Sequence, residues 1–169
     1  MAFALISLGS NLSSNLGDST QTLYSAIQMI DQIAGVDIDR VSHLYLTQPW
    51  GVEDQPEFTN AALGIHTELS PQALLNSLQT IEHQHERKRA QKWGARTLDL
   101  DIISYDELNI DTPDLRLPHP YFSERDFVLY PIAEIYADSP VNGKPISKWL
   151  NDYQQANPNH SAPQTTKNN

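Results

Sequence analysis

Apolar and acidic residues alternate strictly along Leu98-Asp99-Leu100-Asp101-Ile102. Successive side chains leave a β-strand on opposite faces, so the pattern predicts a strand with one apolar face and one acidic face. The apolar face must pack on a core, whereas the two carboxylates repel one another unless a cation lies between them. We therefore expect a half-buried strand that presents Asp99 and Asp101 to a cation, and we take that cation to be Mg²⁺.

Basic residues are concentrated immediately before this strand. Five of the chain's eleven lysines and arginines lie within residues 87–96. An acidic edge strand facing water would account for the two aspartates, but it would not account for the cations beside them. Carboxylates that hold a metal, next to guanidinium groups that hold phosphate oxygens, are typical of a site for a metal-bound polyphosphate.

The order of the expected elements indicates the fold class. Apolar runs and helical periodicities predict, in chain order, a strand at 2–8, a helix at 18–34, strands at 36–46 and 57–67, a helix at 71–85 and the strand at 98–103. This βαββαβ order is that of a ferredoxin-like α+β fold, an antiparallel sheet with both crossover helices on one face. We expect the other face to stay open, to carry Phe58 and Asn60 beside Asp99 and Asp101, and to be roofed by loops at 47–56 and 86–97.

Composition limits the domain organisation and the partners. We expect one domain over residues 1–150, with a further helix near 126–136, and a polar, disordered tail over residues 151–169. The net charge of −10 disfavours a general nucleic-acid binder. No apolar run approaches the roughly 20 residues of a membrane span, and the absence of cysteine excludes disulfides and thiolate zinc sites. We expect a monomeric, cytoplasmic protein that acts on small molecules, without nucleic-acid or membrane partners.

Several sequence blocks resemble one enzyme family. The string from Arg87 to Asp101, R-x-R-x-x-K-W-G-A-R-T-x-D-x-D, is similar to the signature of 6-hydroxymethyl-7,8-dihydropterin pyrophosphokinase of folate synthesis. Further blocks resemble that family in the expected order: Ile6 to Leu12, Asp54 to Ala61, Leu117 to Pro120 and Arg125 to Pro131. Ordered blocks are more specific than any single short motif. The resemblance implies the same α+β fold, and transfer of pyrophosphate from ATP to the hydroxymethyl group of the dihydropterin with release of AMP.

The resemblance also implies roles for individual residues. Asp99 and Asp101 would hold two Mg²⁺ ions on the triphosphate of ATP, and Arg87 and Arg96 would be the catalytic arginines that steady phosphate oxygens. The other residues implied to bind ATP are Gln79, Glu82, Arg89, Lys92, His119 and Arg125. The residues implied to bind the pterin are Thr47, Trp50, Phe58, Asn60, Trp93 and Phe127.

Four positions depart from the family's pattern, and two other functions use some of the same features. The departures are Gln48, Trp50, Glu86 and Ala95, and none of them removes an implied ligand. Of these four, Glu86 and Trp50 are the ones expected to affect the mobile loop and its closure. A metal-dependent nucleotidyltransferase would use the same aspartate pair and release pyrophosphate. A non-catalytic nucleotide- or RNA-binding module would use the open face of the sheet. The paired carboxylates and the net charge of −10 disfavour RNA binding at that face.

Overall fold

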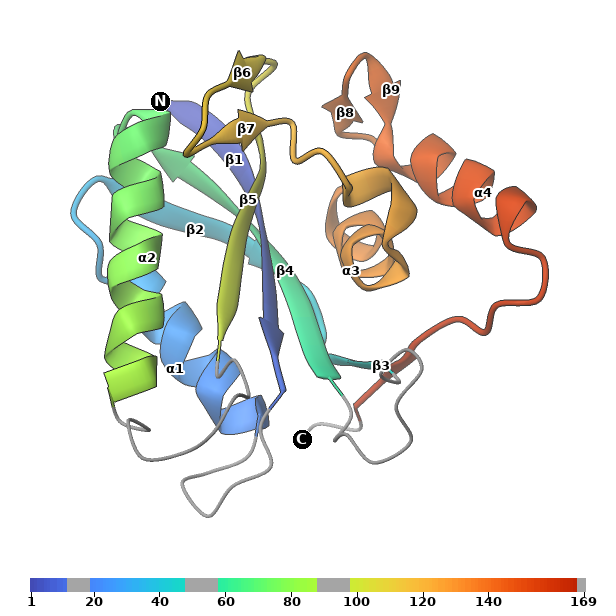
Figure 1. The fold of residues 1–169 in the computed structure, drawn as a ribbon, viewed down its shortest axis with the longest axis horizontal. Coiled ribbons are helices and arrows are strands. Elements are labelled where there is room, and N and C mark those ends of the chain that lie inside the picture. Colours follow the sequence, from blue (N-terminus) through green and yellow to red (C-terminus); the bar gives the residue numbers. More distant parts are fainter. Residues whose placement is uncertain (12–18, 48–57, 88–97, 167–169) are drawn as a thin grey trace.

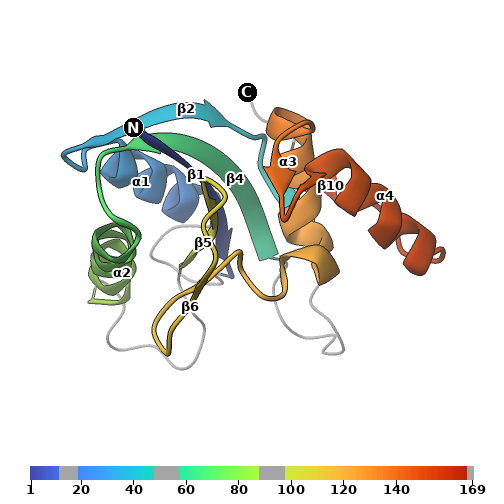
Figure 2. The ribbon, with the colours of Figure 1, turned by 90° about the horizontal axis from the view of Figure 1, so that it is seen from above.

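An antiparallel sheet runs through the centre of the molecule, and helices pack on both of its faces (Figure 1, Figure 2). The computed structural model describes residues 1–11, 19–47, 58–87 and 98–166, without the side chains of Thr47, Glu86 and Arg87. The elements up to the fifth strand are β1 (Ala2–Ser10), α1 (Ser19–Asp31), β2 (Val36–Val41), β3 (Tyr45–Thr47), β4 (Phe58–Thr67), α2 (Pro71–Arg87) and β5 (Asp99–Tyr105). Those that follow are β6 (Ile110–Asp111), β7 (Arg116–Leu117), a 3₁₀ turn (Phe122–Glu124), α3 (Asp126–Tyr136), β8 (Pro140–Val141), β9 (Lys144–Pro145), α4 (Ile146–Ala156) and β10 (Gln164–Thr165).

The ferredoxin-like arrangement is confirmed. The main sheet has the strand order β10-β3-β4-β1-β5, with β2 also paired to β4, and its neighbouring strands are antiparallel. The helices α1 and α2 cover one face, where their apolar stripes meet the inward side chains of β1, β4 and β5. As expected, Leu98, Leu100 and Ile102 lie in this core. The expected helix start at Ser70 is also confirmed, because its Oγ accepts a hydrogen bond from the Ala73 N–H at 3.2 Å.

The predicted strand at 36–46 is interrupted, and this corrects the sequence analysis. β2 ends at Val41 and β3 begins at Tyr45. At the break, the Ser42 N–H donates to the Ala62 carbonyl at 2.9 Å, and the Ser42 hydroxyl accepts from the Ala62 N–H at 2.9 Å. The Ser42 hydroxyl therefore replaces one main-chain acceptor in the pairing with β4. The alternation of side chains over residues 36–46 continues through this point, although the strand itself stops.

The expectation that the second face stays open is wrong over much of its area. The helix predicted near 126–136 is confirmed as α3, and it packs on this face over Leu5, Ala62 and Ile103 (Figure 2). Apolar side chains on a sheet face require a cover, and α3 supplies the apolar stripe that provides it. The second face is thus apolar under α3 and polar where it carries Asn60, Asp99 and Asp101.

The expected division at residue 150 is also corrected. Residues 151–156 complete α4, and its Tyr153 is buried in the core beneath α3 and α4. Further on, Gln164 and Thr165 pair with β3. The polar composition of residues 151–156 gave little sign that they are helical. One apolar contact, made by Tyr153 at helical spacing from Ile146, is enough to hold the last turn of α4 on the core. No helix in the described ranges combines the length and the apolar character that crossing a bilayer requires.

Candidate functional site

One row of paired residues crosses the second face of the sheet. Tyr45 of β3 lies opposite Asn60 of β4, Asn60 lies opposite Gly9 of β1, and Gly9 lies opposite Asp99 of β5. Side chains of directly opposed residues in antiparallel strands leave the same face of the sheet. The predicted placement of Asn60 and Asp99 on one face is therefore confirmed, and Asp101 follows on that face two residues further along β5.

Gly9 keeps the space between Asn60 and Asp99 free of a side chain. A methyl group added at Gly9 would lie 2.9 Å from the Asn60 Oδ1 atom, closer than such groups approach in proteins. The absence of that group lets the Asn60 carboxamide lie directly over the β1 backbone. Sequence reasoning missed this position, although a glycine inside a strand is a signal of close approach.

His119 is held beside the carboxylates with a defined tautomer. The backbone N–H of His119 donates to the Ile103 carbonyl at 2.9 Å, and the ring Nδ1 accepts from the Tyr121 backbone N–H at 3.2 Å. Burial, the largest effect, lowers the pKa of His119; the nearby Asp101 partly offsets this, and Arg125 adds to it. In the neutral ring the proton then lies on Nε2, which makes that nitrogen a hydrogen-bond donor.

Arg125 lies between two aromatic rings at the start of α3. The centre of its guanidinium group is 5.5 Å from the Tyr121 ring and 5.6 Å from the Phe127 ring. Such contacts hold a planar cation in place while its N–H groups remain directed to other partners. The structure thus brings His119, Arg125 and Phe127 together with Asp101 at one end of the second face, although they come from separate sequence blocks.

Glu82 has a structural contact that the sequence did not predict. Its Oε2 accepts the Leu100 N–H at 2.8 Å, so α2 is tied to the strand midway between the two aspartates. β5 ends the strand order of the main sheet, which explains why a side chain and not another strand takes this N–H. Gln79, one turn earlier on α2, is exposed.

Residues 5–137 match the profile of the family described as 7,8-dihydro-6-hydroxymethylpterin-pyrophosphokinase. This chain belongs to that family. A Bacillus subtilis 2-amino-4-hydroxy-6-hydroxymethyldihydropteridine pyrophosphokinase is 46% identical over 124 residues, which cover 73% of this chain and 74% of the relative. The Haemophilus influenzae protein of the same name is 41% identical over 138 residues, with coverage of 82% and 84%.

Solved structures support the fold of this pyrophosphokinase family member independently. Wild-type Plasmodium falciparum HPPK-DHPS superposes with a TM-score of 0.71 at 14% identity, over 98% of this chain and 47% of that chain. The chain therefore spans about half the length of that longer protein. At such low identity the likeness concerns the fold alone, and it agrees with the βαββαβ arrangement expected from the sequence.

Part of the predicted pyrophosphokinase site lies outside the described residues. Thr47 is described through its backbone, which pairs with Phe58, and Arg87 through its place as the last residue of α2. The predicted site residues that fall entirely outside the described ranges are Trp50, Arg89, Lys92, Trp93 and Arg96. The departures at Gln48 and Ala95 lie outside the described residues as well, and so do the expected roofing loops apart from Thr47, Glu86 and Arg87. Glu86 is described only through its backbone, which belongs to α2.

The two carboxylates of β5 are ligands of the type that suits Mg²⁺. Asp99 and Asp101 are partly exposed carboxylates on one strand face, hard oxygen ligands of the kind that Mg²⁺ prefers. Within the ranges that the structure describes, no three acidic, histidine or cysteine side chains gather as a metal site. Mg²⁺ is commonly held by one or two carboxylates together with substrate phosphates, so this pair fits a metal that arrives with a nucleotide.

Proposed function

We propose that this chain transfers pyrophosphate from ATP to the hydroxymethyl oxygen of 6-hydroxymethyl-7,8-dihydropterin at the polar part of its second face. The observation that carries the proposal is the paired row Asn60-Gly9-Asp99, in which an amide and a carboxylate flank a position without a side chain. Family membership supports this reaction over the nucleotidyltransferase and RNA-binding alternatives.

The phosphate half of the proposed site lies at β5. Asp99 and Asp101 would hold two Mg²⁺ ions, which when bound supply neutralisation of the triphosphate charge. The His119 Nε2–H and the Arg125 guanidinium group would donate hydrogen bonds to phosphate oxygens. Arg87 and Arg96 complete the proposal as the arginines that stabilise negative charge on the departing AMP. Gln79, Glu82, Arg89 and Lys92 are proposed to line the nucleotide.

The pterin half lies toward β3. The Asn60 carboxamide offers both donors and an acceptor to the edge of the pteridine ring, and the backbone of Thr47 offers more beside it. Phe58 and Phe127 would contact the flat faces of the ring, where an aromatic side chain stacks well. Trp50 and Trp93 are proposed to complete this pocket.

In the reaction, the hydroxymethyl oxygen forms a bond to the β-phosphorus of ATP, and its O–H bond breaks with release of the proton to solvent. The bond from that phosphorus to the oxygen bridging the α- and β-phosphates breaks, and its electron pair stays with AMP. The protein contributes positioning and electrostatic stabilisation, which are the main sources of catalysis in phosphoryl-type transfer. We further propose a monomeric, cytoplasmic enzyme that acts on these two small molecules.

Product analysis tests the proposal directly. Incubation with ATP, Mg²⁺ and 6-hydroxymethyl-7,8-dihydropterin should release AMP in amounts that match the pyrophosphorylated pterin. Release of ADP, or of free pyrophosphate as from a nucleotidyltransferase, would refute it.

Substitution of the carboxylates gives a second test. Asp99→Asn and Asp101→Asn should each lower kcat at least about a hundredfold, the scale of losing an electrostatic group near reacting charge. Both variants should keep the wild-type unfolding temperature within a few degrees, because the side chains are partly exposed. Asp111→Asn is the matched control, since that carboxylate is 88% exposed on β6. Equal activity of the Asp99 and Asp111 variants would contradict the assignment.

A further inference from the structure

The C-terminal segment 157–166 lies beyond the residues that match the family profile, and it reaches β3. Gln164 pairs with Leu46 and Thr165 pairs with Tyr45, in antiparallel register. One residue later, the Thr166 N–H donates to the Leu44 carbonyl at 2.8 Å. β3 therefore has a strand on each side, β10 and β4, and Figure 1 shows the chain running from the end of α4 back to this edge.

His160 ties the start of this segment to the helices. Its Nδ1 lies 2.7 Å from the Asn157 carbonyl, and its Nε2 lies 2.9 Å from the Tyr130 hydroxyl. A carbonyl only accepts, so Nδ1 carries the proton and the Tyr130 O–H donates to Nε2. The Tyr130 oxygen in turn accepts from the Gln154 amide at 3.0 Å, and the His160 ring packs edge-on against Tyr153 at 5.1 Å. The segment is thus anchored to α3 and α4 at one end and to β3 at the other.

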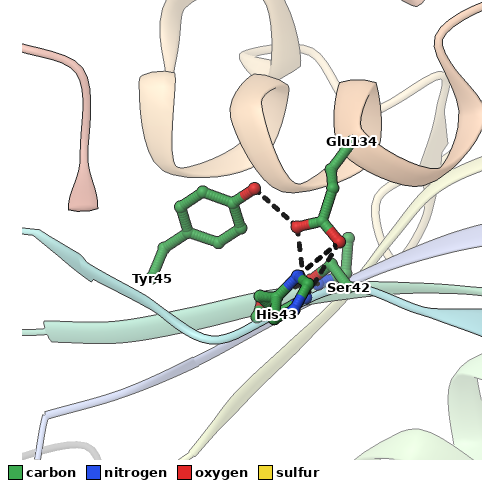
Figure 3. Close-up of polar contacts among 5 residues, drawn as sticks. Ser42, His43, Tyr45 and Glu134 are labelled. Carbon is green, nitrogen blue, oxygen red and sulfur yellow. Dashed lines mark hydrogen bonds and ion pairs between the residues drawn. The ribbon is translucent and has the colours of Figure 1, made fainter. Parts of the chain in front are cut away.

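One carboxylate of α3, that of Glu134, contacts both β3 and His43 just before it (Figure 3). Glu134 accepts from the Tyr45 hydroxyl at 2.6 Å and from the His43 N–H at 3.1 Å, and it lies 2.9 Å from the His43 Nδ1. Tyr130 and Glu134 are four residues apart, so they share one side of α3. The same side of this helix therefore contacts both the C-terminal segment and β3.

β3 belongs to the pterin half of the proposed site. Tyr45 lies opposite Asn60, and Thr47 lies opposite Phe58. Two strands, β4 and β1, separate β3 from β5 with its two aspartates. At the usual strand spacing this separation is about 14 Å, so a shift of β3 should disturb the pterin contacts while leaving the phosphate contacts in place.

We propose that residues 157–166 are a positioning element for the pterin: by pairing with β3 they hold Asn60, Phe58 and the Thr47 backbone in their binding arrangement. This inference rests on the proposed function, since it assigns the pterin to those residues. The segment makes no contact with reacting atoms in this proposal. It acts through main-chain pairing, so the identity of its side chains at 164 and 165 should matter little.

A pair of proline variants tests the pairing itself. Thr166→Pro removes the N–H that donates to the Leu44 carbonyl. N–H directions alternate along a strand, so the Thr165 N–H points away from β3, and Thr165→Pro is the matched control. Thr166→Pro should raise the KM for 6-hydroxymethyl-7,8-dihydropterin about 2- to 12-fold, the ratio that one net hydrogen bond represents. Its KM for ATP and its kcat, and all constants of Thr165→Pro, should stay within about twofold of wild type.

A chain ending at Asn157 provides the second variant, because it keeps α4 and removes the whole strand. Its KM for the dihydropterin should rise at least as much as that of Thr166→Pro, with the KM for ATP unchanged. Unchanged pterin KM in both variants would overturn the inference, and so would equal losses toward both substrates. If the truncated chain fails to fold by circular dichroism, the proline pair decides alone. Wild-type protein that makes no AMP would instead reject the proposed function.

Discussion

Replacing Glu82 should reveal how the two aspartates are held in place. Its carboxylate accepts the Leu100 N–H at 2.8 Å, and Leu100 is 4% exposed. A hydrogen bond to a charged group contributes about 1.5–3 kcal/mol, and leaving a buried N–H without a partner costs a similar amount. In a chain of 169 residues, 1 kcal/mol corresponds to about 2–4 °C in Tm. Glu82→Ala should therefore lower Tm by about 3–12 °C.

Two further variants separate this hydrogen bond from other effects. Glu82→Gln keeps an acceptor without the charge, so it should retain roughly half of the lost stability. Gln79→Ala changes an exposed residue one turn earlier on the same helix and should leave Tm unchanged. Leu100 lies between Asp99 and Asp101 in the chain, so loss of its hydrogen bond should also displace the two carboxylates. Glu82→Ala should therefore raise the KM for magnesium-bound ATP.

The assay is thermal unfolding followed by circular dichroism, with steady-state kinetics on the same preparations. A Glu82→Ala protein that unfolds at the wild-type temperature would refute the argument that this hydrogen bond supports β5. A KM for ATP that rises without any loss of Tm would indicate a direct contact with the nucleotide instead.

Two other predictions follow from contacts on the second face. Gly9→Ala should displace the Asn60 carboxamide, because its Oδ1 atom would lie 2.9 Å from the added carbon. The variant should raise the pterin KM and lower stability by about 1 kcal/mol, the low end for an added core methyl group, because a side-chain end can move. An unchanged pterin KM would contradict the close approach. Burial, followed by hydrogen bonds to carboxylates, raises the pKa of Tyr45 and Tyr136. Their contribution to stability is complete below the unfolded-state pKa of about 10 and is lost as pH rises through the raised folded-state values. Tyr45→Phe with Tyr136→Phe should therefore flatten the fall of Tm above pH 10, and an equally steep fall would argue against it.

Several features of this protein could be read from its sequence because they depend on local periodicity. The alternation at Leu98 to Ile102 reports which face of β5 is buried, and the same reasoning placed Phe58 and Asn60 on the opposite face from Ala61. Helical stripes and the Ser70 cap located α1 and α2. Burial of one face is a demand that each segment carries by itself, so the βαββαβ order follows from the segments in turn.

Other features were decided by contacts between distant parts of the chain. α3 covers the second face because Leu5, Ala62 and Ile103 come together there from separate strands. The C-terminal residues form β10 because β3 offers an unpaired edge, which their own polar sequence does not announce. Glu82 meets the Leu100 N–H from a neighbouring helix in the same way. A residue's own pattern determines which side it buries, whereas the partner that meets it there is set only once the whole chain has folded.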